Sequence, residues 1–208
     1  MSKIDEAIDI LQQMGVPRQQ QNERSGLTLL ALLDVKKRAS WRSAKQRVLR
    51  IHDILLFMKE QYDRDYAENT RETIRRQTIH QFEQAGIVVR NPDDPARATN
   101  SPKTVYSISD EALHVIRSYN TAKWNATLKT FVAEKGKLAE KYRKQREQHK
   151  ISIKVADATL SFSSGTHNEL QARIIDTLHP RFFPEAVLLY VGDTAHKMLY
   201  IKENCWRS

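Results

Sequence analysis

Residues 69–109 read NTRETIRRQTIHQFEQAGIVVRNPDDPARATNSPKTVYSIS, and this stretch decides the fold of the N-terminal part of the chain. Asn69 or Thr70 is suited to cap a helix, with Glu72 or Thr73 in the first turn, and Gly86 is suited to end it. Apolar residues recur between these signals at helical spacing, and we expect three of them to face the core: Ile74, Ile79 and Phe82. The stretch therefore begins with one long amphipathic helix.

A β-hairpin is expected directly after this helix. Residues 87–89 are of strand type, the segment NPDDPARATNSPKT is rich in turn formers, and residues 105–108 alternate as a return strand. Ser109 is then suited to cap a further helix that begins at Asp110.

Shorter helical patterns precede the long helix, over 4–14 and 23–33, with a third from about Ser43 to Asp63. Helix, helix, long helix, strand, loop, strand is the order of a winged helix-turn-helix. In that fold the long helix enters the DNA major groove, and the hairpin loop lies along the backbone or the minor groove. We therefore expect residues 1–120 to form a DNA-binding domain that is mainly α with a small β component.

The long helix and the loop carry side chains suited to DNA. Arginine and glutamine have fork-shaped donors for guanine and adenine edges, and arginine also pairs with phosphate. The expected DNA contacts are Arg71, Arg75, Arg76, Gln77 and His80 on the helix, with Arg90, Arg97, Asn100 and Lys103 on the hairpin. An ordinary solvated helix face is the alternative, because Glu68, Glu72 and Glu83 dilute the positive charge.

The composition is that of a folded, basic protein. The chain has 208 residues, 40% of them hydrophobic, and its 34 Lys and Arg exceed its 25 Asp and Glu to give a net charge of +9. The single cysteine excludes an internal disulfide, and no Cys/His cluster has zinc spacing. No long apolar run or signal peptide is visible, so we expect a cytoplasmic protein without a membrane segment and with a polyanionic partner.

Residues 121–150 hold nine basic and three acidic residues, and thus six of the nine excess charges. Apolar residues recur along one seam of the expected helix: Trp124, Leu128, Phe131, Leu138 and Tyr142. The segment is predicted to be a basic connecting helix whose cations are solvated. The commonest role of such a helix is to pack on its own protein. A second role is compatible with the first, in which Lys141 and Lys144 add contacts to DNA phosphates.

Residues 151–208 change to an α/β pattern of a strand, a helix and two further strands. The helix is expected to bury Leu170, Ile174, Ile175 and Leu178, and Ala186–Val191 resembles a buried strand that is followed by a turn at Gly192. One helix and three strands are fewer than an enzyme domain of this class normally needs, so we expect an incomplete α/β domain.

Three residues of this region could carry phosphodiester chemistry. Clustered carboxylates hold Mg²⁺, which activates water, and a lysine can stand near the nucleophile. Glu169 and Asp193 are the candidate metal ligands, and Lys197 is the candidate lysine. The spacing is not specific, because Gly-Asp occurs in many turns and a helical glutamate is often only solvated. Neither a Gly-x-Ser-x-Gly element nor a P-loop is present.

Residues 69–109 and PRQQQNERSGLTLLALL at 17–33 resemble the N-terminal helix-turn-helix domain of the BsuBI/PstI type II restriction endonucleases. HNELQARIIDTLHPRF and LLYVGDTAHKMLYI resemble the opening of the nuclease domain of that family. The resemblance implies a PD-(D/E)xK-type fold and Mg²⁺-dependent cleavage of both DNA strands at a short palindrome, CTGCAG in the founding members. It also implies a homodimer for the full-length enzyme, and a partner DNA methyltransferase that protects the host.

Carried over to this sequence, the resemblance assigns Glu169 to the helical glutamate of the family, and Asp193, Thr194 and Lys197 to its GDTxxK segment. The family's nuclease domain continues with Pro-Asp and Glu-Ala-Val strands that the ENCWRS ending does not resemble. We therefore expect a truncated, weakly active or inactive form of the enzyme. The alternative is a winged-helix regulator that binds DNA without catalysis.

Overall fold

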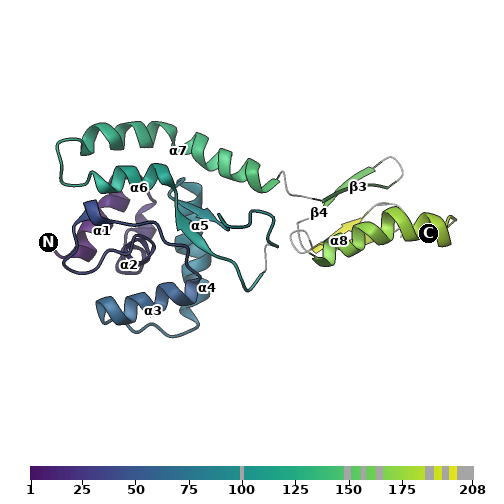
Figure 1. The fold of residues 1–208 in the computed structure, drawn as a ribbon, viewed down its shortest axis with the longest axis horizontal. Coiled ribbons are helices and arrows are strands. Elements are labelled where there is room, and N and C mark those ends of the chain that lie inside the picture. Colours follow the sequence, from purple (N-terminus) through teal and green to yellow (C-terminus); the bar gives the residue numbers. More distant parts are fainter. Residues whose placement is uncertain are drawn as a thin grey trace. The chain divides into compact units, whose positions relative to one another are not determined.

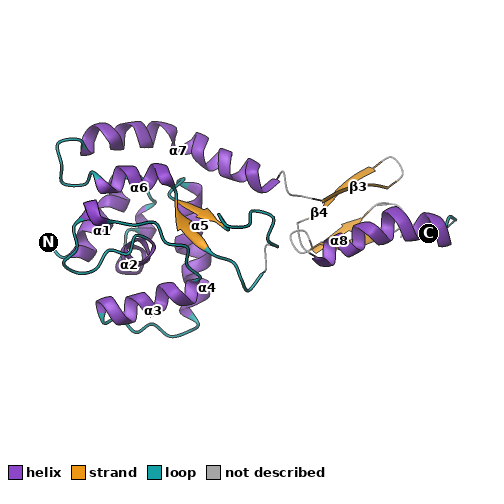
Figure 2. Ribbon diagram, in the orientation of Figure 1, coloured by secondary structure: helices purple, strands orange, loops and turns teal. Residues whose placement is uncertain are grey.

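The computed structural model describes residues 1–98, 101–147, 151–155, 158–162, 166–185, 190–193 and 197–200. The described chain is mostly helical with small two-stranded sheets, as expected for an α+β protein (Figures 1 and 2). It divides into two compact units. The first comprises Met1–Asp93 and Val105–Arg143, and the second comprises Asp94–Thr104 and Lys144–Ser208.

The first unit is built around α2 (Glu23–Leu32), which packs against α1 (Lys3–Gln13). Every α2 residue from Ser25 to Leu32 is buried, so this helix lies in the interior rather than at the surface. The two helices approach closely at Gly26, where an added Cβ would lie 3.2 Å from the Cγ1 atom of Ile8 and 3.3 Å from the carbonyl oxygen of Ile4. Glycine is therefore the residue that this crossing accommodates.

The helical pattern expected from Ser43 to Asp63 is wrong in its first part. A short 3₁₀ turn, η2 (Trp41–Ser43), is followed by extended chain, and α3 begins later (Ile51–Tyr62). The extended residues bond to other elements: Lys45 N donates to Leu33 O at 2.8 Å, and Leu49 forms a β-bridge with Tyr106. Tertiary backbone pairing replaces helical bonds here, because the backbone groups of this segment find partners elsewhere.

The long helix is confirmed as one run of α4 (Thr70–Thr73), a π-helical η3 (Ile74–Ile79) and α5 (His80–Gln84). Ile74, Ile79 and Phe82 are fully buried, as expected, and η3 packs on α2. Gly86 follows with a φ of +69°, a left-handed conformation that ends the helix.

The hairpin is also confirmed. Strands β1 (Val88–Arg90) and β2 (Tyr106–Ile108) are antiparallel, with Val88 opposite Ile108 and Arg90 opposite Tyr106. Ser109 caps α6 (Asp110–Arg117) by accepting a hydrogen bond from Ala112 N at 3.2 Å, as predicted.

The basic helix α7 (Trp124–Glu147) begins on the first unit, where Figure 1 shows it running alongside α6. Its Trp124 is buried, donates through Nε1 to Gln13 Oε1 at 2.7 Å, and lies edge-on to Tyr119 with ring centroids 4.9 Å apart. Tyr119 in turn stacks edge-on against Trp41. This aromatic chain joins α7 to α1 and to the segment before α3.

The second unit contains the hairpin of β3 (Ile151–Val155) and β4 (Ala158–Phe162), followed by the helical run α8 (Thr166–Arg173), η4 (Ile174–Leu178) and α9 (His179–Phe182). A second hairpin consists of β5 (Tyr190–Asp193) and β6 (Lys197–Tyr200). The single strand predicted after residue 151 is thus a strand pair.

Two expectations for this unit are wrong. Leu170, Ile174 and Leu178 are exposed rather than buried, because the helix turns Asn168, Ala172 and Ile175 inward and packs with that side on β3. Gly192 lies within β5, opposite Met198, and not in the turn expected there. Residues 186–189 of the expected buried strand lie outside the described residues. Within the described ranges, no helix is long and apolar enough to cross a membrane.

Replacing Trp124 by alanine is expected to lower the free energy of unfolding by about 3 to 5 kcal/mol, because the change removes a buried indole and leaves a cavity between α7 and α1. Chemical denaturation followed by circular dichroism measures the effect. Val132→Ala, an exposed change on the same helix, is the control and should stay within about 0.5 kcal/mol of the native protein. Equal stability of the two variants would show that α7 is not anchored by its aromatic residue.

Candidate nucleic-acid interface

The outward side of the long helix carries the five residues expected to contact DNA. Arg71, Arg76, Gln77 and His80 are exposed, and the Arg75 side chain retains 37% of its accessible surface. The opposite side, with Ile74 and Phe82, is fixed in the core. The packing of the helix therefore leaves these polar side chains at the surface.

Each of the three arginines on this surface is paired with a glutamate of the same helix or of the residues just before it. Arg75 binds Glu72 through both Nε and Nη2, at 3.0 and 2.8 Å, and Arg76 donates to the same carboxylate. Arg71 donates to Glu68 at 2.6 Å. Hydrogen bonds from Arg75 and then Arg76 lower the pKa of Glu72 to about 2, so this carboxylate is charged at neutral pH.

A residue of α2, Arg24, orients the Gln77 side chain by a hydrogen bond. Arg24 Nη2 donates to Gln77 Oε1 at 3.2 Å. Because arginine has donors only, this contact fixes which end of the Gln77 amide is the oxygen. Among the described residues no hydrogen bond occupies the amide NH₂ group of Gln77, so this group is available as a donor. His80 is hydrogen-bonded to Gln84 at 3.0 Å.

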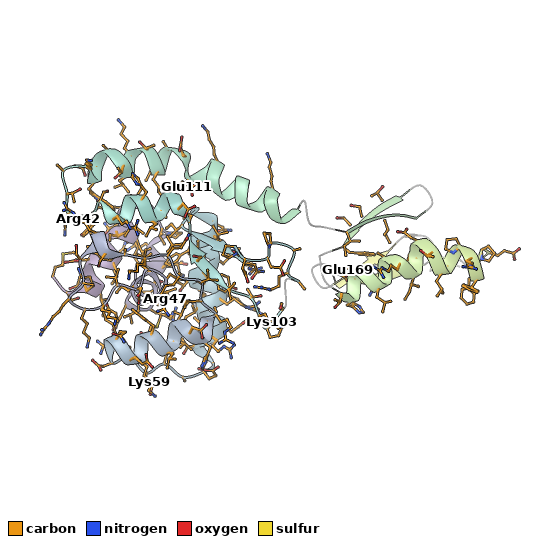
Figure 3. The ribbon with its side chains drawn as sticks, in the orientation of Figure 1. Arg42, Arg47, Lys59, Lys103, Glu111 and Glu169 are labelled. Atoms are coloured by element: carbon orange, nitrogen blue, oxygen red, sulfur yellow. The ribbon has the colours of Figure 1, made fainter. Side chains whose placement is uncertain are left out.

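The hairpin loop is held by its own polar contacts. Asn91 takes a φ of +47° and accepts a hydrogen bond from Val105 N at 3.0 Å, which closes the base of the loop. Arg97 donates to Lys103 O at 2.9 Å, and Lys103 itself is exposed (Figure 3). The Arg90 guanidinium lies over the Tyr106 ring, and its Nε is 3.6 Å from Glu83 Oε1. The Arg90 side chain is largely buried. Asn100 lies outside the described residues.

The seam of α7 serves packing in its first half, where Trp124 and Phe131 are buried and Leu128 is partly buried. Lys144 is exposed, whereas the side chains of Leu138, Lys141 and Tyr142 lie outside the described set. The interpretation as a helix packed on its own protein therefore holds for the first half. The phosphate-contact interpretation stays a prediction.

A second basic surface, not predicted from the sequence, is the connector 36–50 between α2 and α3. It contains seven Lys and Arg and no acidic residue, a signal hidden when charge is counted over 1–120. Across the described chain, three of these cations have ion-pair partners, whereas no ion pair involves the other four: Lys36, Arg38, Arg42 and Lys45. Two contacts hold the connector in place: buried Trp41 donates through Nε1 to Glu6 at 2.6 Å, and the Ala44 carbonyl accepts hydrogen bonds from Arg117.

The predicted nuclease residues lie on three elements of the second unit. Glu169 is exposed on α8 (Figure 3), and Asp193 and Lys197 stand directly opposite each other in the backbone register of β5 and β6. The side chains of Asp193 and Lys197, and all of Thr194, lie outside the description. Among the described residues, no three histidine, cysteine or carboxylate groups gather at one point.

Comparison with known families and solved structures gives consistent matches. Residues 1–140 match the model of the BsuBI/PstI restriction endonuclease HTH domain, and residues 151–208 match that of the BsuBI/PstI restriction endonuclease domain. The chain is 42% identical to the type II restriction enzyme BsuBI of Bacillus subtilis over 207 residues, which cover 99% of this chain and 66% of that protein. It is 28% identical to the type II restriction enzyme AplI of Arthrospira platensis, covering 91% and 58%.

The structure is similar to that of the SdaI restriction endonuclease, with a TM-score of 0.62 and 32% identity, covering 95% of this chain and 62% of that one. The chain thus spans slightly less than two thirds of the length of these relatives. Both parts of the sequence match models of one family, in the order in which they occur. The chain belongs to the BsuBI/PstI family of type II restriction endonucleases.

Proposed function

We propose that this protein acts as a type II site-specific deoxyribonuclease of a restriction-modification system. One observation carries the proposal. The helix 70–84 buries one side in the core and exposes arginine and glutamine side chains on the other, and it lies in the region that matches the family's HTH domain. Double-stranded DNA is the proposed substrate. The CTGCAG palindrome of the founding family members is the first sequence to test.

The proposed DNA reader is a winged helix-turn-helix within residues 1–120. Two features support this assignment: α3 precedes the long helix, and Leu49 extends the β1–β2 hairpin by a bridge to Tyr106. In this arrangement Arg75 and Gln77 would face base edges in the major groove. The loop residues Arg97, Asn100 and Lys103 would lie against the phosphate backbone.

Two basic segments outside the helix 70–84 are proposed to contact DNA phosphates and not base edges. The first is the connecting helix at 121–150, with Lys141 and Lys144, and the second is the connector 36–50. Because the connector's backbone is already fixed, its cations lose little chain entropy when they meet a phosphate. Residues 151–208 are proposed to be the N-terminal part of the catalytic domain.

The chemistry proposed for that part is hydrolysis of a phosphodiester bond in a PD-(D/E)xK-like fold. The family generally uses a divalent metal, which we propose to be Mg²⁺, with Glu169 and Asp193 as ligands and Lys197 near the attacking water. A palindromic site favours a twofold homodimer on DNA. A cognate methyltransferase and a cytoplasmic location belong to the same proposal, because such a system must act on DNA inside the cell and spare the host's own.

Arg75→Ala should reduce the preference for a CTGCAG duplex over a shuffled duplex by about 5- to 150-fold, because a bidentate contact to a base discriminates by about 1 to 3 kcal/mol. Lys144→Ala should instead weaken binding to both duplexes alike and reduce the slope of log K against log salt by about 1. Fluorescence anisotropy over a salt series measures both effects. Equal losses on both duplexes from Arg75→Ala would remove this residue from base reading.

Cleavage of a plasmid that carries one CTGCAG site, followed on an agarose gel, should require Mg²⁺ and produce breaks at that site. Asp193→Asn should abolish this cleavage. DNA binding by the same variant should remain, because the substituted residue lies outside the proposed DNA reader. Glu169→Gln is expected to behave in the same way, and Asp176→Asn, an exposed change on the same helical run, is the control. Site-specific binding by the native chain with no cleavage under any metal would favour the regulator.

A further inference from the structure

We propose that Glu72 is a specificity-determining residue, which suppresses binding to non-cognate DNA by holding Arg75 and Arg76. The inference rests on the proposed function, since it assumes that the helix 70–84 faces DNA. It assigns a role to an acidic residue that otherwise only dilutes the positive charge of this surface.

The Glu72 carboxylate bonds to arginine side chains and not to the N-terminus of its helix. An acidic residue at the third position of a helix commonly accepts a hydrogen bond from the backbone of the capping residue. Asp5 of α1 does so from Ser2 N, and Asp53 of α3 does so from Arg50 N, each at 2.9 Å. Glu72 occupies the same position of α4, yet in the described range 1–98 Asn69 makes no side-chain cap and the Glu72 carboxylate accepts from arginines instead.

The geometry of the pairing is the second argument. Arg75 uses Nε and Nη2 against the two carboxylate oxygens, which is the same two-donor edge that would meet a guanine or a phosphate. Arg76 shares the carboxylate, so one negative charge serves two cations. The low pKa of Glu72 keeps this charge in place throughout the physiological range of pH.

A role in stability alone does not account for this arrangement. Half of the Glu72 side-chain surface and 73% of the Arg76 side-chain surface are exposed, and ion pairs this open to water stabilise a fold little. The pairing also lies on the side of the helix away from Ile74 and Ile79, which carry its packing. Its main consequence is therefore for what approaches from outside.

On DNA the carboxylate acts differently in two situations. Near the phosphate backbone of an arbitrary sequence, Glu72 repels phosphate and keeps both arginines partly neutralised, so their contribution to non-specific affinity is small. At a matching sequence the paired Arg75 is already oriented as a fork, and the loss of the pairing is compensated by contacts to base edges. The Glu72 carboxylate thus lowers the affinity for DNA at sequences where no contact to a base replaces its pairing with the arginines.

The test compares the native chain with Glu72→Gln, which removes the charge but keeps the size of the side chain. Anisotropy titrations on a shuffled duplex and on a CTGCAG duplex, each over a salt series, give affinities and salt slopes. We expect Glu72→Gln to bind the shuffled duplex about 3- to 10-fold more tightly, with a salt slope steeper by about 1 to 2, and to show a smaller ratio between the two duplexes. Glu72→Asp, which keeps the charge, should restore most of the ratio.

Glu60→Gln is the matched control, because it removes one exposed negative charge from α3 of the same unit. It should change non-specific binding by much less than Glu72→Gln. Equal effects of the two variants, or weaker binding of both duplexes by Glu72→Gln with an unchanged slope, would overturn the inference while leaving the proposed function intact. Failure of the native chain to bind either duplex would overturn both.

Discussion

The burial of α2 is the constraint on which the first unit depends. Because every residue from Ser25 to Leu32 is buried, other elements must pack around this helix. The elements that contact it are α1, α3, η3 and β2. The close crossing at Gly26 seats α1, and the fit of η3 against α2 decides which side of the long helix turns outward. Position along the long helix is therefore sufficient to assign a residue to the core or to the candidate DNA surface.

Charge is distributed over this scaffold in two ways. On the long helix the arginines are balanced by Glu68 and Glu72, so its outward side has donors of defined orientation but little excess charge. On the connector 36–50, four cations lack a balancing acid in the described structure. We infer that affinity and sequence preference are carried by different segments, with phosphate attraction from the basic segments and discrimination from the helix.

Local signals were sufficient for much of the first unit. The inward positions of Ile74, Ile79 and Phe82, the Ser109 cap and the Trp124 anchor follow from helical spacing and side-chain chemistry. The late start of α3 does not, because the bonds of Lys45 and Leu49 are made to residues far away in the sequence. In the second unit the apolar stripe at Leu170 gave no information about which side of α8 meets β3. The pairing of Glu72 with two arginines likewise does not follow from the sequence, since the same spacing equally allows a capping box.

The central claim is that the outward side of the helix 70–84 meets DNA bases. The most direct test places a photo-crosslinking amino acid at Gln77 in the full chain, with the same group at Lys59 on the exposed side of α3 as the comparison. Irradiation of the complex with a CTGCAG duplex should attach position 77 to nucleotides within the site and leave position 59 unattached. Crosslinking from position 59 with none from position 77 would contradict the account.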